Sequence, residues 1–131
     1  MSQENVDLTR AAYEQFSRGD FSRAFEASTD DFELVTAAEM PDAGTYRGQE
    51  ARDWILAYIH SFDGYAQEAT EIIDAGDRVV VALLQRGRPR ESDLTVESRW
   101  WQVLTFQNAG VTRIEMFSGR AEALEAAELR G

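Results

Sequence analysis

"WWQVLTFQNAGVTRIEMF", residues 100–117, is typical of two long β-strands joined by a tight turn at 108–110. Apolar and polar side chains alternate along it, as they do in strands whose two faces meet different surroundings. One face of the first strand carries Ser98, Trp100, Gln102, Leu104 and Phe106, and the other carries Arg99, Trp101, Val103 and Thr105. Large apolar groups on both faces indicate that both sides of this sheet are covered.

Most of the other strand signals lie in the second half of the chain. Turn residues at Gly76-Asp77 and a loop over 89–93 separate them. We therefore expect a four-stranded antiparallel meander, preceded by one strand in which Phe32, Leu34 and Thr36 share a face. The expected strands are 30–38, 65–75, 78–88, 94–107 and 111–117.

Apolar residues at steps of three and four predict helices elsewhere. The strongest such pattern joins Ala51, Trp54, Ile55, Tyr58, Ile59 and Phe62. Asp63-Gly64 is expected to end that helix, Gly19 to end a first one, and Asp20 to cap a short second one. The expected helices are 4–18, 21–29, 51–62 and 123–129.

This order of elements predicts one α+β domain over residues 1–131, with helices packed on one face of a curved sheet. The net charge of -11 repels polyanions, so nucleic acid is not expected as a partner. No apolar run is long enough for a bilayer and no secretory leader is visible, so we expect a cytoplasmic protein with no membrane partner. The absence of cysteine excludes thiolate chemistry.

Three strings, taken in order, resemble the nuclear transport factor two-like superfamily, and within it the SnoaL-like and ketosteroid-isomerase-like proteins. They are "YEQFSRGDFSRAFEASTDDFEL", "YRGQEARDW" and "WWQVLTFQNAGVTRIEMF". The resemblance covers nearly the whole chain. It implies a cone, in which a strongly curved mixed or antiparallel sheet wraps around about three N-terminal helices, as in a cystatin-like roll. It also implies a pocket at the open end and commonly a dimer through the outer sheet face.

The resemblance leaves the chemistry open, because the superfamily includes isomerases, cyclases, dehydratases, epoxide hydrolases and noncatalytic members. Ketosteroid isomerases use a carboxylate base, a tyrosine and a protonated acid, an arrangement long used as an example of pKa tuning. Aligned on the shared turns, those positions fall at Thr36, Ala12 and Gln102. None of the three can do that chemistry. A shift of one residue would bring Tyr13 to the tyrosine position, and Glu33 or Val35 would then take the base position.

Other family chemistries also lack residues in the expected places. Dehydratases use histidines, and the single histidine, His60, lies off the stripe formed by Trp54 and Tyr58, so it is interpreted as solvated. One histidine makes a metal site unfavourable, and no cofactor is expected. The charged residues suited to epoxide hydrolysis are Asp53, Asp74, Arg99, Arg113 and Glu115, and strand alternation puts the last three on the face opposite Gln102.

The inward positions instead predict an apolar pocket for a small hydrophobic or aromatic molecule. Gln102 is the exception on its face, because its amide needs hydrogen-bonding partners when buried. A threonine, a tyrosine hydroxyl, a water or a ligand could serve. The candidate ligand-binding residues are Tyr13, Phe16, Thr36, Trp54, Tyr58, Trp100, Gln102 and Met116, with Phe32, Leu34, Ile55, Leu104 and Ile114 also facing inward.

The outer face of the same strand, with Arg99, Trp101 and Val103, predicts a homodimer, because a symmetry mate is the simplest cover for it. Two hypotheses follow. The first is a SnoaL-like small-molecule pocket protein, either a binder or an isomerase, cyclase or hydrolase with unassigned catalytic residues. The second is a noncatalytic dimeric module whose cavity is filled by its own side chains. A cavity of roughly several hundred Å³ favours the first, and a packed interior favours the second.

Overall fold

The computed structural model describes residues 2–40 and 42–128. Within these ranges the chain forms three helices and six strands. The helices are α1 (Ser2–Ser17), α2 (Gln49–His60) and α3 (Arg120–Ala126). The strands are β1 (Ser28–Val35), β2 (Thr45–Arg47), β3 (Phe62–Ala75), β4 (Arg78–Pro89), β5 (Val96–Gln107) and β6 (Gly110–Phe117).

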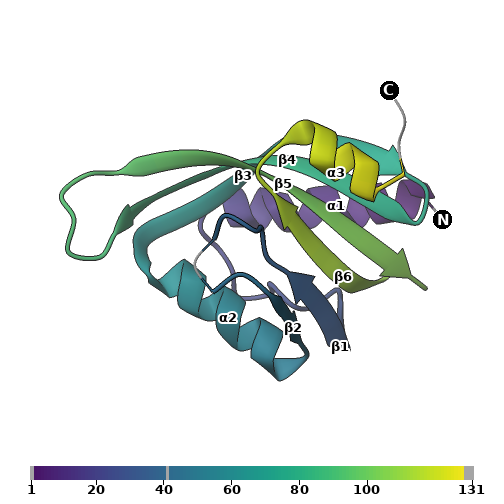
Figure 1. Ribbon diagram of the computed structural model, residues 1–131, viewed down its shortest axis with the longest axis horizontal. Helices are drawn as coiled ribbons and strands as arrows, with labels where there is room; N and C mark the ends of the chain where they lie inside the picture. Colours follow the sequence, from purple (N-terminus) through teal and green to yellow (C-terminus); the bar gives the residue numbers. More distant parts are fainter. Residues whose placement is uncertain (1, 41, 129–131) are drawn as a thin grey trace.

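The strands form a single mixed sheet in the order β2-β1-β6-β5-β4-β3. β3 to β6 are an antiparallel meander, whereas β1 runs parallel to β6 and antiparallel to β2. Register shifts in β3 and in the β1–β6 and β5–β6 pairs accompany a sheet that is bent and open rather than closed (Figure 1). The α+β class and the curved mixed sheet predicted from the sequence are confirmed.

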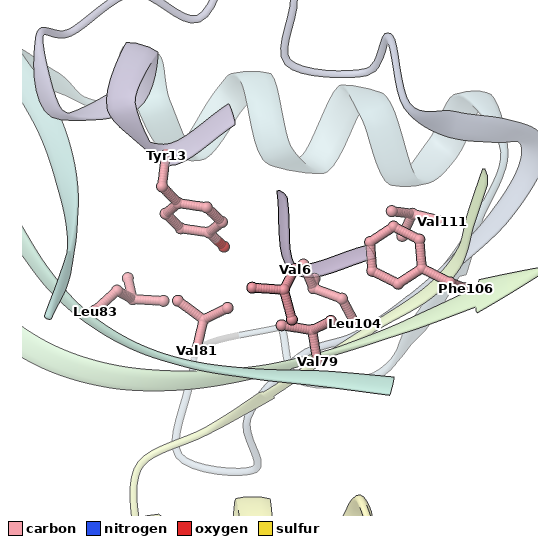
Figure 2. Close-up of a cluster of buried hydrophobic side chains, with 8 residues drawn as sticks. All are labelled: Val6, Tyr13, Val79, Val81, Leu83, Leu104, Phe106 and Val111. Atoms are coloured by element: carbon pink, nitrogen blue, oxygen red, sulfur yellow. The ribbon is translucent and has the colours of Figure 1, made fainter. Parts of the chain in front are cut away.

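The concave face of the sheet packs against α1. Alternate residues of β4, namely Val79, Val81 and Leu83, are almost fully buried with Val6 and Tyr13 of α1. Figure 2 shows Val6 and Tyr13 reaching from the helix toward these strand residues and toward Leu104, Phe106 and Val111. We call this concave side the inner face.

A second cluster joins α2 to β1 and to the end of β6. Phe32 and Leu34 of β1 are buried there with Ala51 of α2 and with Met116. Trp54 and Ile55 of α2 pack against the same cluster. As a result α2 lies across the end of the inner face, where Figure 1 places it beside β1 and β2.

Part of the opposite, outer face is covered by α3 of the same chain. Val80 and Val103 are fully buried with Ala123 and Ala127, while the Arg120 guanidinium lies 5.1 Å from the centre of the Trp101 ring. The prediction that this face is covered is therefore confirmed at Val103, whereas Trp101 is half-buried and Arg99 is exposed. The sequence predicted that a symmetry mate covers Val103. That prediction is wrong, because α3 of the same chain covers this residue.

Several predicted boundaries also need correction. No helix forms over 21–29, where Asp20 accepts a hydrogen bond from the Ser22 backbone N–H at 3.1 Å and residues 22–27 form successive turns. Only α1 and α2 are therefore N-terminal helices. α2 ends at His60, so Phe62 and Asp63-Gly64 belong to β3, in which Gly64 has a φ of 65°.

The short strand β2 was not predicted from the sequence. The C-terminal helix begins at Arg120, earlier than the predicted residue 123, and position 129 of that prediction lies outside the described residues. Among the residues described, no helix combines the length and apolarity that a membrane crossing needs.

Ala123→Glu should lower the free energy of unfolding by about 3 kcal/mol or more, because Ala123 has no exposed surface and the substitution places a carboxylate between α3 and the sheet. The matched control is Ala121→Glu on the exposed side of α3, which should stay within about 0.5 kcal/mol of the parent. Urea unfolding followed by circular dichroism measures both. Equal stability of the two variants would show that α3 does not cover the outer face.

Candidate functional site

A cavity of about 120 Å³ lies between α1, α2 and the inner face of the sheet. Its wall is built mostly from aromatic and aliphatic side chains. Among the described residues, none that line it is Asp, Glu, Arg or His. The lining residues are Leu8, Thr9, Ala12, Tyr13, Phe16, Phe21, Ala24, Phe25, Ala27, Ser28, Leu34, Trp54, Ile55, Tyr58, Ile59, Gln67, Gln85, Gln102, Leu104, Phe106, Val111, Ile114 and Met116.

Six of the eight candidate ligand-binding residues line this cavity, and two do not. Thr36 is buried, but its hydroxyl accepts the Gly44 backbone N–H at 2.9 Å and donates to the Gly44 carbonyl at 3.2 Å. Trp100 packs against both inner clusters, and its indole N–H donates to Ser98 Oγ at 3.1 Å. The six that line the cavity are Tyr13, Phe16, Trp54, Tyr58, Gln102 and Met116.

Gln102 meets a tyrosine hydroxyl, one of the partners expected for it. Tyr13 donates its hydroxyl proton to Gln102 Oε1, and both residues are buried. Tyr13 projects from α1 into the space above the sheet (Figure 2). Tyr13 therefore supplies the tyrosine hydroxyl that faces Gln102. This is the residue that reaches the tyrosine position when the sequence alignment with ketosteroid isomerases is shifted by one residue from Ala12.

A second tyrosine–glutamine pair lies on the same inner face. The Tyr58 hydroxyl of α2 donates to Gln85 Oε1 at 2.7 Å, and Gln85 is 3% exposed. Gln67, the register partner of Gln85 on β3, donates its Nε2 to the Tyr65 hydroxyl at 2.7 Å.

Sequence reasoning missed Gln67 and Gln85. The signal for Gln85 was present, because it follows Val79, Val81 and Leu83 at steps of two on the same face.

Aromatic rings form one side of the cavity. Trp54 and Tyr58, one helical turn apart on α2, are stacked with ring centres 5.5 Å apart and an angle of 6° between their planes. Phe16 and Phe21 stack at 5.0 Å where α1 leads into the turns. Such a wall offers flat apolar surface to a flat ligand.

The tyrosine hydroxyls of the site remain protonated in the folded protein. Burial raises the pKa of Tyr13, Tyr58 and Tyr65, because the tyrosinate anion would lose its hydration. For Tyr58 the hydrogen bond to Gln85 partly opposes the rise of the pKa. At neutral pH these groups are therefore hydrogen-bond donors and not bases.

The other residues considered for chemistry lie outside the cavity. His60 is exposed at the end of α2, and Asp53 accepts a hydrogen bond from Gln49 at 2.8 Å on the helix surface. Arg113 pairs with Glu33 and Glu115 on the outer face. Asp74 accepts a backbone N–H at the β3–β4 turn and Arg99 is exposed on β5. The described residues include no cluster of three or more His, Cys, Asp or Glu placed to hold a metal ion.

Comparisons with solved structures identify the architecture. A protein from Burkholderia xenovorans described as NTF2-like is 28% identical, with a TM-score of 0.67 and 97% of each chain covered. The chain has the NTF2-like fold. TerC, crystallised with polyporic acid, is 22% identical with a TM-score of 0.74 over 95% of this chain and 98% of its own.

A Jannaschia protein named as a SnoaL-like polyketide cyclase is 15% identical with a TM-score of 0.73, covering 99% of this chain and 95% of its own. The resemblance predicted from the sequence is confirmed. No protein-family model and no curated protein matches the chain.

The buried tyrosines of this NTF2-like chain should make it lose stability as the pH rises above about 10. In the unfolded chain tyrosine ionises near pH 10, whereas the pKa of Tyr13 and Tyr65 is raised in the folded state. Above pH 10 the unfolded state therefore binds fewer protons. The free energy of unfolding then falls by about 1.4 kcal/mol per pH unit for each such tyrosine. This contribution is fully present below pH 10 and is lost above it.

Tyr13→Phe should remove one tyrosine's share of that slope, and the double variant Tyr13→Phe/Tyr65→Phe should remove two. Urea unfolding between pH 8 and pH 11 measures the slopes. An unchanged slope in Tyr13→Phe would contradict the assignment.

Proposed function

We propose that the protein binds a small, largely uncharged aromatic molecule in the cavity between α1, α2 and the inner face of the sheet. The observation that carries the proposal is the wall itself, in which aromatic rings surround two tyrosine–glutamine pairs. The described residues that line the wall include no ionised side chain. Apolar cavities with a few placed polar groups are the usual form of small-molecule sites.

The uncharged wall argues for an uncharged ligand. Moving an ion from water into an apolar cavity without a partner costs far more than hydrogen bonds from neutral amides return. A neutral molecule with a few hydrogen-bond acceptors avoids that cost. Its rings would gain contact with the stacked Trp54 and Tyr58 side chains.

The volume argues for about one ring. The sequence led us to expect several hundred Å³, as in many ligand sites, and the cavity is smaller, about 120 Å³. Phe21 and Phe25 from the turns after α1 share its wall with Phe16. A dry engineered cavity of about 150 Å³ holds benzene, so the present volume suits a monocyclic ligand.

Two relatives support the ligand class. TerC was crystallised with polyporic acid, and the Jannaschia protein is named as a polyketide cyclase. Among the described residues, the cavity wall offers no carboxylate or imidazole to take a proton from carbon, and its tyrosines are held protonated. We therefore propose binding, with hydrogen-bond polarisation of the ligand as the chemistry that the wall supports.

Ala12→Leu tests the proposal by filling the cavity. Ala12 lines the cavity, so the larger side chain should weaken binding of p-xylene at least tenfold and leave the free energy of unfolding within about 1 kcal/mol of the parent or higher. The control is Ala11→Leu, one residue away on the exposed side of α1. Titration of ¹³C-labelled methyl groups by NMR reports binding through Ile114 and Met116, which line the cavity, with exposed Leu94 as the reference.

Absence of methyl shifts at Ile114 and Met116 in the parent protein would overturn the proposal. Equal affinity of Ala12→Leu and Ala11→Leu for p-xylene would show that the ligand binds outside this cavity.

We also propose the homodimer through the outer face, now centred on Arg99 and the half-buried Trp101 and excluding Val103. Analytical ultracentrifugation at micromolar concentration should give twice the monomer mass. Arg99→Glu should shift the distribution toward monomer, because it replaces a cation at the contact by an anion and so increases the repulsion between two protomers that each carry a net charge of -11. A monomer mass for the parent protein would contradict the proposal.

A further inference from the structure

Gln85 is a buried amide with only part of its hydrogen-bonding capacity used. Its side chain is 3% exposed, its Oε1 accepts the Tyr58 hydroxyl at 2.7 Å, and its Nε2 has no hydrogen-bond partner in the structure. A buried donor without an acceptor destabilises the folded state, and native proteins hold few of them. The missing partner of this nitrogen therefore needs an explanation.

The cavity supplies one, because Gln85 is part of its wall. Tyr58 takes the oxygen end of the amide, which leaves the nitrogen end without a protein partner. The neighbouring Gln67 uses its own Nε2 on the Tyr65 hydroxyl. A hydroxyl that donates to an amide oxygen also polarises the amide and strengthens its N–H groups as donors.

Gln102 repeats this arrangement farther along the sheet. Its Oε1 accepts the Tyr13 hydroxyl, and the hydrogen bonds among the described residues include none donated by its Nε2. Gln102 is the register partner of Val81, and Gln85 lies four residues farther along β4 on the same face. At about 3.3 Å per residue the backbone positions of the two residues are about 13 Å apart along the strands. Both side chains line the same cavity.

We propose that Gln85 and Gln102 bind the two opposite ends of a neutral one-ring ligand that carries a carbonyl oxygen at each end. The proposal rests on the proposed function and adds the chemical class of the ligand. Both free groups are donors, so the ligand supplies acceptors. The described wall has no cation to compensate a carboxylate, so the acceptors are neutral.

The probes are 1,4-benzoquinone, which has oxygens at both ends of one ring, and p-xylene, which has methyl groups there. The chain contains no cysteine and no lysine, so addition of those side chains to the quinone does not compete. In a purely apolar cavity the more water-soluble quinone binds less tightly than the hydrocarbon. We expect the parent protein to bind the quinone at least as tightly as p-xylene, measured by the same methyl titration.

Gln85→Leu should weaken quinone binding about tenfold and change p-xylene binding less than twofold. Gln102→Leu should do the same, and the double variant should bind p-xylene in preference to the quinone. Gln107→Leu, the same substitution at an exposed site at the end of β5, is the control and should leave both affinities unchanged. If Gln85→Leu does not fold, Gln85→Met of similar volume replaces it.

The outcomes separate the two proposals. If the parent protein binds p-xylene but binds the quinone clearly less tightly, the cavity is a binding site and the role of the two amides is wrong. Quinone affinity in Gln85→Leu within twofold of the parent also overturns the inference. If neither probe binds, the proposed function fails and the inference fails with it.

Discussion

Burial of both faces of β4 and β5 is the constraint on which the rest of the molecule depends. Val79, Val81 and Leu83 lie under α1, while Val80 and Val103 lie under α3. Because successive side chains of a strand point to opposite faces, a slip of one residue would exchange these two sets. It would also carry Gln85 and Gln102 out of the cavity. The apolar packing on the two faces therefore fixes which polar groups reach the interior.

The two amides contribute to the site at some cost to the fold. Replacing a buried polar pair by apolar groups of the same shape is often neutral or stabilising, whereas each unmet donor costs about 1–3 kcal/mol. Two tyrosine hydroxyls from α1 and α2 satisfy the amide oxygens, and Gln85 Nε2 has no acceptor among the described residues. The same two helices pack on apolar residues of the sheet, and the cavity lies between them and its inner face.

Much of this arrangement could be predicted from the sequence, because strand alternation shows directly which residues share a face. It predicted the meander and the inward position of Gln102, and the same period would have found Gln85 after Val79, Val81 and Leu83. Local patterns were weaker guides. The segment 21–29 has a helical spacing of apolar residues. A helix of that length is only marginally stable without tertiary packing, and residues 22–27 form turns instead.

The remaining differences arise from contacts between distant segments. Alternation shows that a face is covered but does not show by what, so Val103 was assigned to a symmetry mate when α3 covers it. Thr36 continues the inward period of β1, but its hydroxyl bonds to the Gly44 backbone across the loop and leaves the cavity wall. For both residues strand alternation gave the correct face of the sheet. The segment that contacts each residue, a helix for Val103 and a loop for Thr36, could not be predicted from the local sequence pattern.

The described cavity wall differs in charge from the interior of ketosteroid isomerases. The protein carries a net charge of -11, yet the described cavity wall holds no ionised group. In ketosteroid isomerases the corresponding interior holds carboxyl groups, one as base and one kept protonated by its apolar site. Here an amide faces the tyrosine instead, and an amide cannot gain or lose a proton near neutral pH. The proposed site would therefore recognise oxygen by donating hydrogen bonds, with an affinity independent of pH until the tyrosines ionise or the fold is lost.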